Sequence, residues 1–326
     1  MSAAGAAAAA SEVTSLTERA CRHDPHAVAR LISLFQDRRP AAAPRRREAL
    51  RLLADRPEAV VVGITGTPGS GKSTLLGRLT SELLRGDDRL SIAVLAIDPS
   101  SPISGGALLG DRTRLGSHAD PRLFFRSEAA DAELGGLSPS SFAVCRMLCK
   151  LFDCVIVETV GIGQSEGDIR HLADHVYLVL SPLGGDELQL MKAGIIEIPD
   201  AFVINKSDEP SAGRTERQLR ASLWLARPFD AERLPVVRTS AKTGAGVHDL
   251  AALVAAQVAA GPAADRAARD RYFLERWVKD EWGRRGLAYL RGPLRGAGGL
   301  IAACGGLDEA IETFTHSYAS EHTLTS

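Results

Sequence analysis

Residues 66–74 read Gly66-Thr67-Pro68-Gly69-Ser70-Gly71-Lys72-Ser73-Thr74. An apolar run precedes it at 59–64, and a helical pattern of apolar residues begins at Lys72. A strand, a glycine-rich loop ending in Gly-Lys-Ser and a helix, in that order, are typical of a phosphate-binding loop. The glycines allow backbone N–H groups and the positive end of the following helix to face an anion.

We therefore expect residues 66–74 to bind the phosphates of a nucleotide. Lys72 is expected to reach the β- and γ-phosphates as part of the catalytic machinery, and the Ser73 hydroxyl is expected to ligate Mg²⁺. A flexible glycine turn is the alternative, but it does not explain why strand, loop, Lys-Ser pair and helix follow one another.

The composition is that of a globular protein without a strong charge bias. Hydrophobic residues make up 45% of the 326 residues, and 39 Lys and Arg stand against 40 Asp and Glu, which gives a net charge of -1. This balance offers no general attraction to nucleic acid or to an anionic membrane. No uniformly apolar run reaches about 18 residues, the length that a transmembrane helix needs. We therefore expect neither a nucleic-acid partner nor a membrane partner.

Cysteine usage and the first residues predict a cytoplasmic location. The five cysteines are scattered through the chain, which suits a reducing compartment better than a disulfide framework. The alanine-rich start, 1–10, carries no Lys or Arg, which argues against a secretory signal. We interpret residues 1–11 as a disordered leader.

Periodicity and breaks divide the rest of the chain into three parts. Residues 12–56 show helical periodicity with a break near 38–40, which predicts two helices. Residues 57–260 alternate short apolar runs with helical segments, which predicts an α/β, doubly wound, mostly parallel sheet. Residues 261–326 are predicted to form a helical arm. The seven predicted strands are 59–63, 92–98, 123–126, 154–158, 176–180, 202–205 and 236–239.

Polar residues stand at the ends of predicted strands, where ligands bind in doubly wound sheets. Asp98 ends the second strand and Asp111 lies in the glycine-rich loop after it, and we predict a catalytic or metal role for both. Glu158 ends a buried strand three residues before Gly161, which suits the Mg²⁺ shell of a phosphate site. Gln164 is a candidate for orienting the attacking water, and a solvated loop amide is the alternative.

The predicted sixth strand ends in Asn205-Lys206-Ser207-Asp208. A carboxylate at the place of Asp208 can accept hydrogen bonds from the N1–H and 2-amino group of guanine, a pair of donors that adenine lacks. After the seventh strand, the backbone of the next residues can contact the same base. The sequence therefore predicts GTP as the nucleotide, bound through Asn205, Lys206, Asp208, Ser240, Ala241 and Lys242.

The last part of the chain leaves two alternatives open. Trp277 and Trp282 lie in a predicted helix at 264–286, where they either anchor a second subunit or pack back onto the parent domain. The glycine-rich stretch 291–306 is predicted as loop, and a final helix is predicted at 307–318.

Cysteine and histidine spacing does not predict a transition-metal site. Cys145, Cys149 and Cys154 fall on a predicted helix and at the start of a buried strand, so we interpret them as buried thiols. His171 and His175 have the i, i+4 spacing of a helical metal pair but lack the accompanying glutamate, so no metal role is assigned to them.

Taken together, the motifs resemble the MeaB/ArgK/MMAA family of P-loop GTPases, from about residue 27 to residue 246. The resemblance implies a homodimeric GTPase that acts as chaperone of an adenosylcobalamin-dependent acyl-CoA mutase, chiefly methylmalonyl-CoA mutase, and that gates cofactor loading. The blocks that carry it are 66–74, 98–101, 104–106, 109–111, 158–166, 185–187 and 205–208.

The same resemblance implies roles for single residues. Lys72 and Ser73 would hold phosphate and Mg²⁺, and Asp98 would serve hydrolysis. Asp111 and Glu158 would complete the metal environment. The loop 184–192 would be a third switch that communicates with the mutase, and the helices from 264 onward would form the dimerisation arm.

Two other functions are compatible with a phosphate-binding loop. The ArgK branch suggests a kinase of amino-acid transport binding proteins, because the same loop geometry serves transfer to a side chain as well as to water. Asn205-Lys206-Ser207-Asp208 disfavours ATP as the donor for that reaction. A nickel-delivering GTPase is the other alternative, and it requires a Cys or His cluster near the switch loops, which the sequence does not show.

Overall fold

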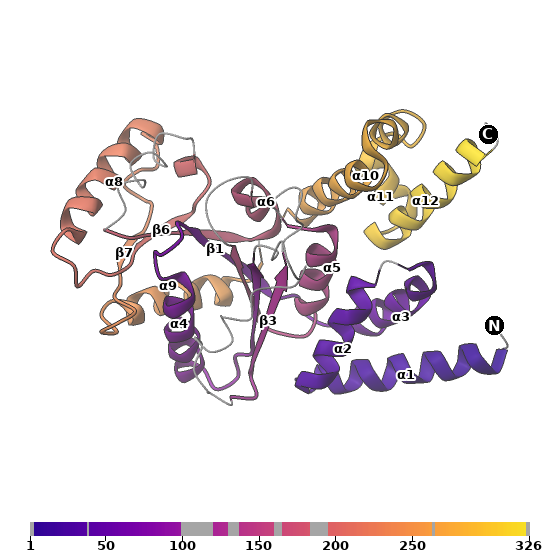
Figure 1. Cartoon of the computed structure of the whole chain (residues 1–326), viewed down its shortest axis with the longest axis horizontal. Coiled ribbons are helices and arrows are strands. Elements are labelled where there is room, and N and C mark those ends of the chain that lie inside the picture. Colours follow the sequence, from indigo (N-terminus) through magenta and orange to yellow (C-terminus); the bar gives the residue numbers. More distant parts are fainter. Residues whose placement is uncertain are drawn as a thin grey trace, which may run out of the picture. The chain divides into compact units, whose positions relative to one another are not determined.

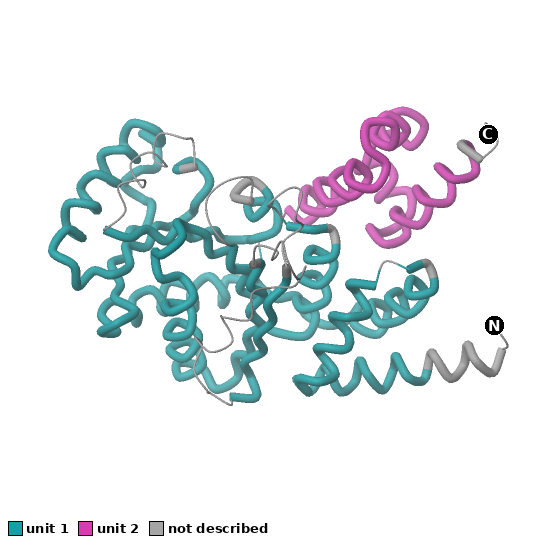
Figure 2. The backbone as a smooth tube through the Cα atoms, in the orientation of Figure 1, with its two compact units in different colours: residues 1–262 teal, residues 263–326 magenta. Residues whose placement is uncertain are grey.

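The computed structural model describes residues 3–37, 39–98, 120–129, 137–159, 165–182, 195–262 and 265–323. These residues form two units, Met1–Pro262 and Ala263–Ser326, which Figure 2 distinguishes by colour. The second unit begins two residues after the start of the helical arm that the sequence predicts.

The first unit is built on a seven-stranded sheet in which every neighbouring pair of strands is parallel (Figure 1). All seven predicted strands are present, with small differences at their ends, and the strand order is β3-β2-β4-β1-β5-β6-β7. Parallel strands covered on both faces are apolar throughout, which is why short apolar runs revealed them. The strands are β1 Val60–Gly66, β2 Ile92–Asp98, β3 Leu123–Ala129, β4 Cys154–Thr159, β5 His175–Leu180, β6 Ala201–Ile204 and β7 Val236–Arg238.

Helices cover both faces of this sheet, which confirms the doubly wound fold. Helices α4 (Lys72–Gly86) and α9 (Val247–Ala260) bury their apolar sides against one face. Helix α8 (Ala212–Ala226) packs on the other face, and so does α6 (Ser165–Leu172), whose Ile169 lies against Gly63 of β1. A Cβ at Gly63 would lie 2.8 Å from that isoleucine, so any other residue here would force the isoleucine to shift. Within the described ranges, no helix is long and apolar enough to span a bilayer.

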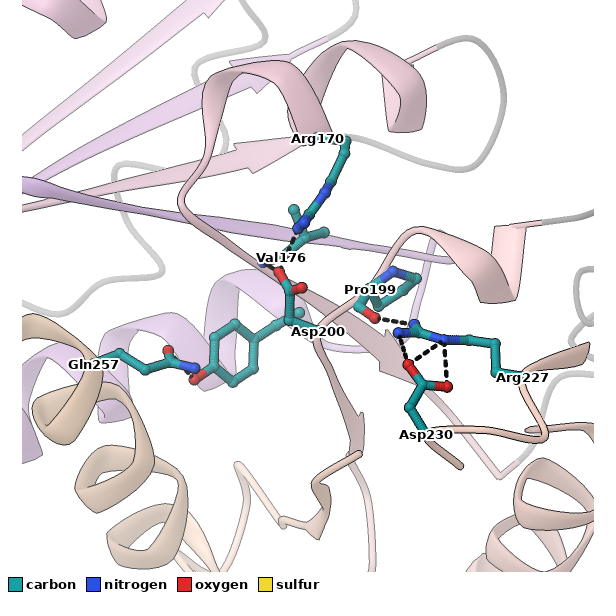
Figure 3. A network of polar contacts seen from close by, with 8 residues as sticks. Arg170, Val176, Pro199, Asp200, Arg227, Asp230 and Gln257 are labelled. Atoms are coloured by element: carbon teal, nitrogen blue, oxygen red, sulfur yellow. Dashed lines mark hydrogen bonds and ion pairs between the residues drawn. The ribbon is translucent and has the colours of Figure 1, made fainter. Parts of the chain in front are cut away.

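Aspartates accept backbone hydrogen bonds at the end of the sheet where the strands begin. Each stands directly before a strand, and its carboxylate accepts a hydrogen bond from a backbone N–H at the start of the neighbouring strand. Because such N–H groups lie at the end of the ladder, the carboxylates replace partners that the sheet does not provide. The contacts, each 2.8 Å long, join Asp153 to Ser91, Asp174 to Val61 and Asp200 to Val176, and Figure 3 shows the last of them.

The N-terminal preface contains three α-helices rather than the two predicted: α1 (Ala3–Cys21), α2 (Pro25–Gln36) and α3 (Ala43–Leu53), with the short 3-10 turn η1 (Pro40–Ala42) between the last two. The missed break has a clear signal. Asp24 caps α2 by accepting from the N–H groups of His26 and Ala27, and Pro25 occupies the first helical position.

Helix α1 begins at Ala3, inside the stretch 1–11 that the sequence predicts to be a disordered leader. Alanine has the highest helix propensity of all residues, so an alanine-rich start favours helix over coil. The composition bias that indicated disorder is therefore also a helix signal.

A buried polar junction joins the preface to the sheet. The side chain of Gln36, the last residue of α2, donates through Nε2 to Glu128 Oε1 of β3 at 2.8 Å. Burial raises the pKa of Glu128, while hydrogen bonds from Ser141 and Gln36 and the charge of Arg126 act in the opposite direction. Ser141 belongs to α5 (Pro139–Leu148), so the carboxyl group links three elements.

The second unit is helical, with α10 (Arg266–Arg291), α11 (Gly296–Cys304) and α12 (Leu307–Thr323). Helix α10 is interrupted at Gly283, whose φ of 59° and ψ of -149° are accessible only to glycine. The prediction of a loop over 291–306 was wrong, because α11 occupies most of it. Its glycines Gly296 and Gly305 take positive φ at the two ends of the helix, where glycine favours termination.

Aromatic side chains form the core of the second unit. Trp277 and Trp282 of α10 make an edge contact with ring centroids 4.6 Å apart, and both contact the buried Phe314 of α12. The two tryptophans thus pack within the arm itself, a third possibility beside the two considered from the sequence.

The aspartate contacts at the sheet edge predict a specific loss of stability. Asp174→Ala leaves the Val61 N–H without its acceptor in a buried position, and we expect the unfolding free energy to fall by about 1–3 kcal/mol. Asp174→Asn keeps an acceptor oxygen and should retain most of the stability. Urea denaturation of both variants, followed by far-UV circular dichroism, measures the difference. Equal losses in the two variants would contradict the role assigned to the hydrogen bond.

The buried Glu128 predicts a pH dependence of stability. Because its pKa is raised in the folded chain, ionisation is less favourable there than in the unfolded chain, where the carboxyl titrates near 4.5. Stability should therefore fall as pH rises from about 4.5 through the raised folded value. Glu128→Gln does not ionise but still accepts from Gln36, so it should lack this fall and be more stable than the wild type at neutral pH. Denaturation midpoints measured from pH 4 to pH 8 test this, and parallel curves for the two proteins would refute it.

Candidate nucleotide-binding site

The loop between β1 and α4 has the backbone shape of an anion site. Gly69 and Gly71 take φ values of 77° and 84°, and Ser70 N–H donates to Thr67 O at 3.2 Å to close a turn. Helix α4 begins at Lys72 without a side-chain cap, so the N–H groups of its first turn are available to an anion. The backbone of this loop therefore has the shape that a phosphate-binding loop requires.

Two glycines of this loop are required by their neighbours. A Cβ at Gly66 would lie 2.1 Å from the carbonyl oxygen of Val179 in β5, and its φ of 149° is also unfavourable for other residues. A Cβ at Gly71 would lie 2.6 Å from Nδ2 of Asn205. The loop can follow this path, close to the sheet and to the guanine motif, only with glycine at both positions.

The Lys72 ammonium lies over the loop. This buried side chain donates through Nζ to the carbonyl oxygens of Gly66, at 2.9 Å, and Thr67, at 3.0 Å. Both acceptors belong to the loop itself, so the charge is held where the phosphates of a bound nucleotide would lie.

Asn205 connects the phosphate loop to the two loops predicted to recognise the base. Its side chain, which is 1% exposed, donates through Nδ2 to Ser70 O at 2.8 Å. Its Oδ1 accepts from Ala241 N–H at 3.1 Å and from the Thr239 hydroxyl at 3.3 Å. The next residue, Lys206, donates through Nζ to Gly69 O at 2.7 Å. The motifs of the phosphate loop, β6 and β7 are thus assembled into one site.

Asp208 is prepared to act as an acceptor. The Ser240 hydroxyl donates to its Oδ1 at 2.6 Å, and the N–H of Thr243 donates to the same hydroxyl oxygen at 3.1 Å. The hydrogen bond from Ser240 is the main cause that lowers the pKa of Asp208. The carboxylate is therefore ionised at neutral pH and exposed, as recognition of the two guanine donors requires.

One positioning contact in this region was not found from the sequence. Arg78 of α4 donates through Nη2 to the carbonyl oxygen of Lys242 at 2.9 Å, across 164 residues of chain. It fixes the loop after β7 to the helix that follows the phosphate loop. No local pattern around either residue indicates this pairing.

Ser73 and Glu158 form the part of the predicted metal site that the structure describes. The Ser73 hydroxyl donates to Glu158 Oε1 at 2.8 Å, and the glutamate is buried at the end of β4. A hydroxyl and a carboxylate side by side, next to the phosphate loop, are hard oxygen ligands that suit Mg²⁺. The residues present therefore fit the ion.

The remaining predicted residues are described only in part or not at all. Asp98 is the last residue of β2, and the pairing of Ile97 with Thr159 brings its backbone next to the end of β4. The Asp98 side chain, Asp111, Gln164 and the loop 184–192 lie outside the described residues.

The cysteines and histidines to which the sequence assigns no metal role do not form a metal site in the described part of the chain. Cys145, Cys149 and Cys154 are free and buried, and burial raises the pKa of Cys154 to about 12, which leaves an unreactive thiol. Across the described residues, no group of three or more His, Cys, Asp or Glu side chains is arranged to hold a metal ion.

Solved structures share the fold. The crystal structure of a LAO/AO transport system kinase superposes with a TM-score of 0.59 over 86% of each chain, at 22% sequence identity. At this identity the likeness concerns the fold alone.

Sequence similarity to known proteins shows the family as well as the fold. The family model for the methylmalonyl Co-A mutase-associated GTPase MeaB matches residues 28–283. A relative from Pyrococcus abyssi is 43% identical over 243 residues, 73% of this chain and 74% of its own length. The GTPase ArgK of Escherichia coli is 43% identical over 196 residues, which cover 58% of each chain. The methylmalonic aciduria type A homolog of Mus musculus is 39% identical over 58% of this chain and 46% of its own length. The chain therefore belongs to the MeaB family and is a P-loop GTPase that hydrolyses GTP.

Proposed function

We propose that this GTPase is Mg²⁺-dependent and serves as chaperone of an adenosylcobalamin-dependent acyl-CoA mutase, with methylmalonyl-CoA mutase as the first candidate. Hydrolysis of GTP to GDP and phosphate would gate cofactor loading and protect the mutase. The main structural support for a GTP cycle is the Asn205 side chain, which joins the phosphate loop to the guanine motif. Support for the client comes from the description of the family, which names the mutase.

The described residues supply most of what phosphoryl transfer to water needs. The loop N–H groups and the first turn of α4 hold the phosphates in place, and the Lys72 ammonium balances charge on the oxygens between the β- and γ-phosphorus atoms. Ser73 and Glu158 would hold Mg²⁺, together with Asp98 and Asp111. A bound Mg²⁺ would neutralise phosphate charge. Asp98 is proposed to serve hydrolysis and Gln164 to orient water.

The guanine base is selected by Asp208. Its carboxylate is fixed by Ser240 and remains ionised, so it can pair with both N1–H and the 2-amino group. An adenine ring offers no such pair of donors and would leave the carboxylate without partners. The kinase alternative therefore needs GTP as donor, and the destination of the γ-phosphate decides between the two reactions.

The proposal extends to assembly and location. We place the protein in the cytoplasm as a homodimer, with α10, α11 and α12 as the dimerisation arm. This assignment follows the family resemblance, and the charge balance and scattered cysteines of the chain are compatible with it.

Lys72→Ala tests the catalytic core. We expect steady-state phosphate release from GTP to fall by about 10²-fold or more, because the cation nearest the transferred phosphoryl group is lost. Arg85→Ala, which removes an exposed cation from the other end of the same helix, is the matched control and should retain the wild-type rate.

Methylmalonyl-CoA mutase is added in a second arm of this assay. Stimulation of the wild type but not of Lys72→Ala supports the chaperone role. Basal hydrolysis without stimulation leaves the GTPase intact and rejects this client. Labelled γ-phosphate recovered on a protein instead of as free phosphate would favour the kinase.

Asp208→Asn tests base selection. The amide can no longer accept both guanine hydrogen bonds, so we expect the affinity for GTP to fall by about 10²-fold or more. Xanthosine triphosphate carries an oxygen in place of the 2-amino group and should bind the variant better than GTP does. Competition binding with the two nucleotides measures the switch, and Glu209→Gln is the neighbouring control with the same change of charge. An unchanged preference for GTP would show that Asp208 does not contact the base.

A further inference from the structure

The end of helix α8 carries an exposed apolar surface. Among the described residues, the exposed large hydrophobic side chains are Trp224 (51% exposed), Leu225 (87%) and Phe229 (98%). All three lie within residues 224–229, which we name the apolar tip. Single exposed apolar residues are ordinary on protein surfaces, whereas a cluster of this kind marks an interaction site.

The apolar tip is held in a defined shape. Arg227, in its middle, donates through Nη1 to Pro199 O at 2.7 Å and through Nε to both carboxylate oxygens of Asp230, at 3.1 and 3.2 Å (Figure 3). Beneath the tip, Leu223 and Leu234 are buried in the core that α8 shares with the sheet. The chain therefore buries Leu223 and exposes Leu225 at this helix end, and an anchored arginine fixes the turn that follows.

The exposed side of α8 next to the tip is basic. Residues 212–230 contain four arginines and two acidic residues, a local charge of +2 in a chain of net charge -1. Arg220 pairs with Glu216, while exposed Arg214 and Arg217 make no ion pair within the described part of the chain. An apolar tip beside unpaired arginines is complementary to an apolar hollow with an acidic rim.

We propose that the apolar tip and the arginines of α8 form the docking surface for the mutase, whose matching surface is an apolar hollow with acidic residues at its edge. This inference rests on the proposed function. Trp and Arg are among the residue types that contribute most binding energy at protein interfaces, and Phe is enriched there, which favours a protein over a lipid surface as the occupant.

The position of α8 connects this surface to the nucleotide. Helix α8 starts at Ala212, four residues after Asp208, and Ser211 at its beginning donates through Oγ to Pro182 O at 3.2 Å. Pro182 stands just after β5, and Asp208 belongs to the guanine motif. A mutase bound at the far end of α8 therefore contacts the same helix that adjoins the GTP site.

Leu225→Gln combined with Phe229→Gln tests the surface, since both side chains are exposed and the replacement suits a helix end. The full chain, loaded with a non-hydrolysable GTP analogue, is titrated with methylmalonyl-CoA mutase holoenzyme by isothermal calorimetry. We expect Kd to rise about tenfold or more, with basal GTP hydrolysis unchanged. Ala255→Gln combined with Ala256→Gln places the same residue at two exposed positions of α9 and should bind like the wild type.

Arg214→Gln combined with Arg217→Gln tests the charge complementarity. Removing two exposed cations should slow association and reduce its dependence on salt concentration, because opposite charges accelerate encounter. Stopped-flow association measured at several ionic strengths gives both quantities. An unchanged salt dependence would refute the acidic rim.

The outcomes separate this proposal from the one on which it rests. If the wild type binds the mutase and the Leu225/Phe229 variant binds equally well, the docking surface is wrong and the chaperone function stands. If the wild type does not bind the mutase, both are rejected. If the tip instead mediates binding to vesicles containing anionic lipid, and the glutamine variant loses that binding, the surface is a membrane contact and the proposal fails.

Discussion

The nucleotide site depends on the hydrogen bonds of one buried amide, Asn205. Its Nδ2 holds a carbonyl of the phosphate loop and its Oδ1 holds the backbone after β7, so three segments far apart in sequence keep their positions through one side chain. Leaving a buried amide without a hydrogen-bond partner lowers the stability of the folded protein by about 1–3 kcal/mol. A displacement of any one of the three segments would therefore be unfavourable. The constraint also explains why the last glycine of the phosphate loop admits no side chain, since Asn205 occupies that space.

The N-terminal and C-terminal ends of the parallel strands differ in their polar contacts, and the register of the strands determines which residues lie at each end. At the end of the sheet where the strands begin, aspartates accept hydrogen bonds from the first N–H groups of three strand segments. At the C-terminal ends of the strands, Glu158 pairs in register with Ala96 of β2, and Ala96 pairs with Ser127 of β3, so the three share one face of the sheet. Glu128 follows Ser127 in the strand and therefore points to the opposite face. One carboxyl therefore meets Ser73 of the phosphate loop and the other meets Gln36 of the preface. The fold thus places a buried acid toward the nucleotide and another toward the N-terminal helices, close together at one edge.

The strands, the phosphate loop and the guanine motif could be predicted from the sequence because each is a local pattern. Errors arose where one residue type has two structural meanings. Glycines indicated a loop over 291–306 but instead bound helix α11, and alanines indicated disorder at a position where α1 is helical. The bracing contact between Arg78 and Lys242 could not be predicted, because only the folded chain brings the two residues together. The nucleotide, metal and catalytic roles assigned to single residues stay predictions, and Asp111, Gln164 and the Asp98 side chain also lie outside the described residues.

Helix α8 carries both apolar residues that the core of the fold buries and apolar residues that it leaves exposed. The core needs an apolar residue once per turn, and Leu219 and Leu223 supply it on the side that faces the sheet. Trp224 and Leu225 point elsewhere, and Phe229 follows on a turn whose geometry is fixed by Arg227. Burial does not account for these large apolar side chains, because all three are exposed. The proposed docking surface would give these side chains a role, and the helix that presents them is the one that begins beside the base-recognition motif.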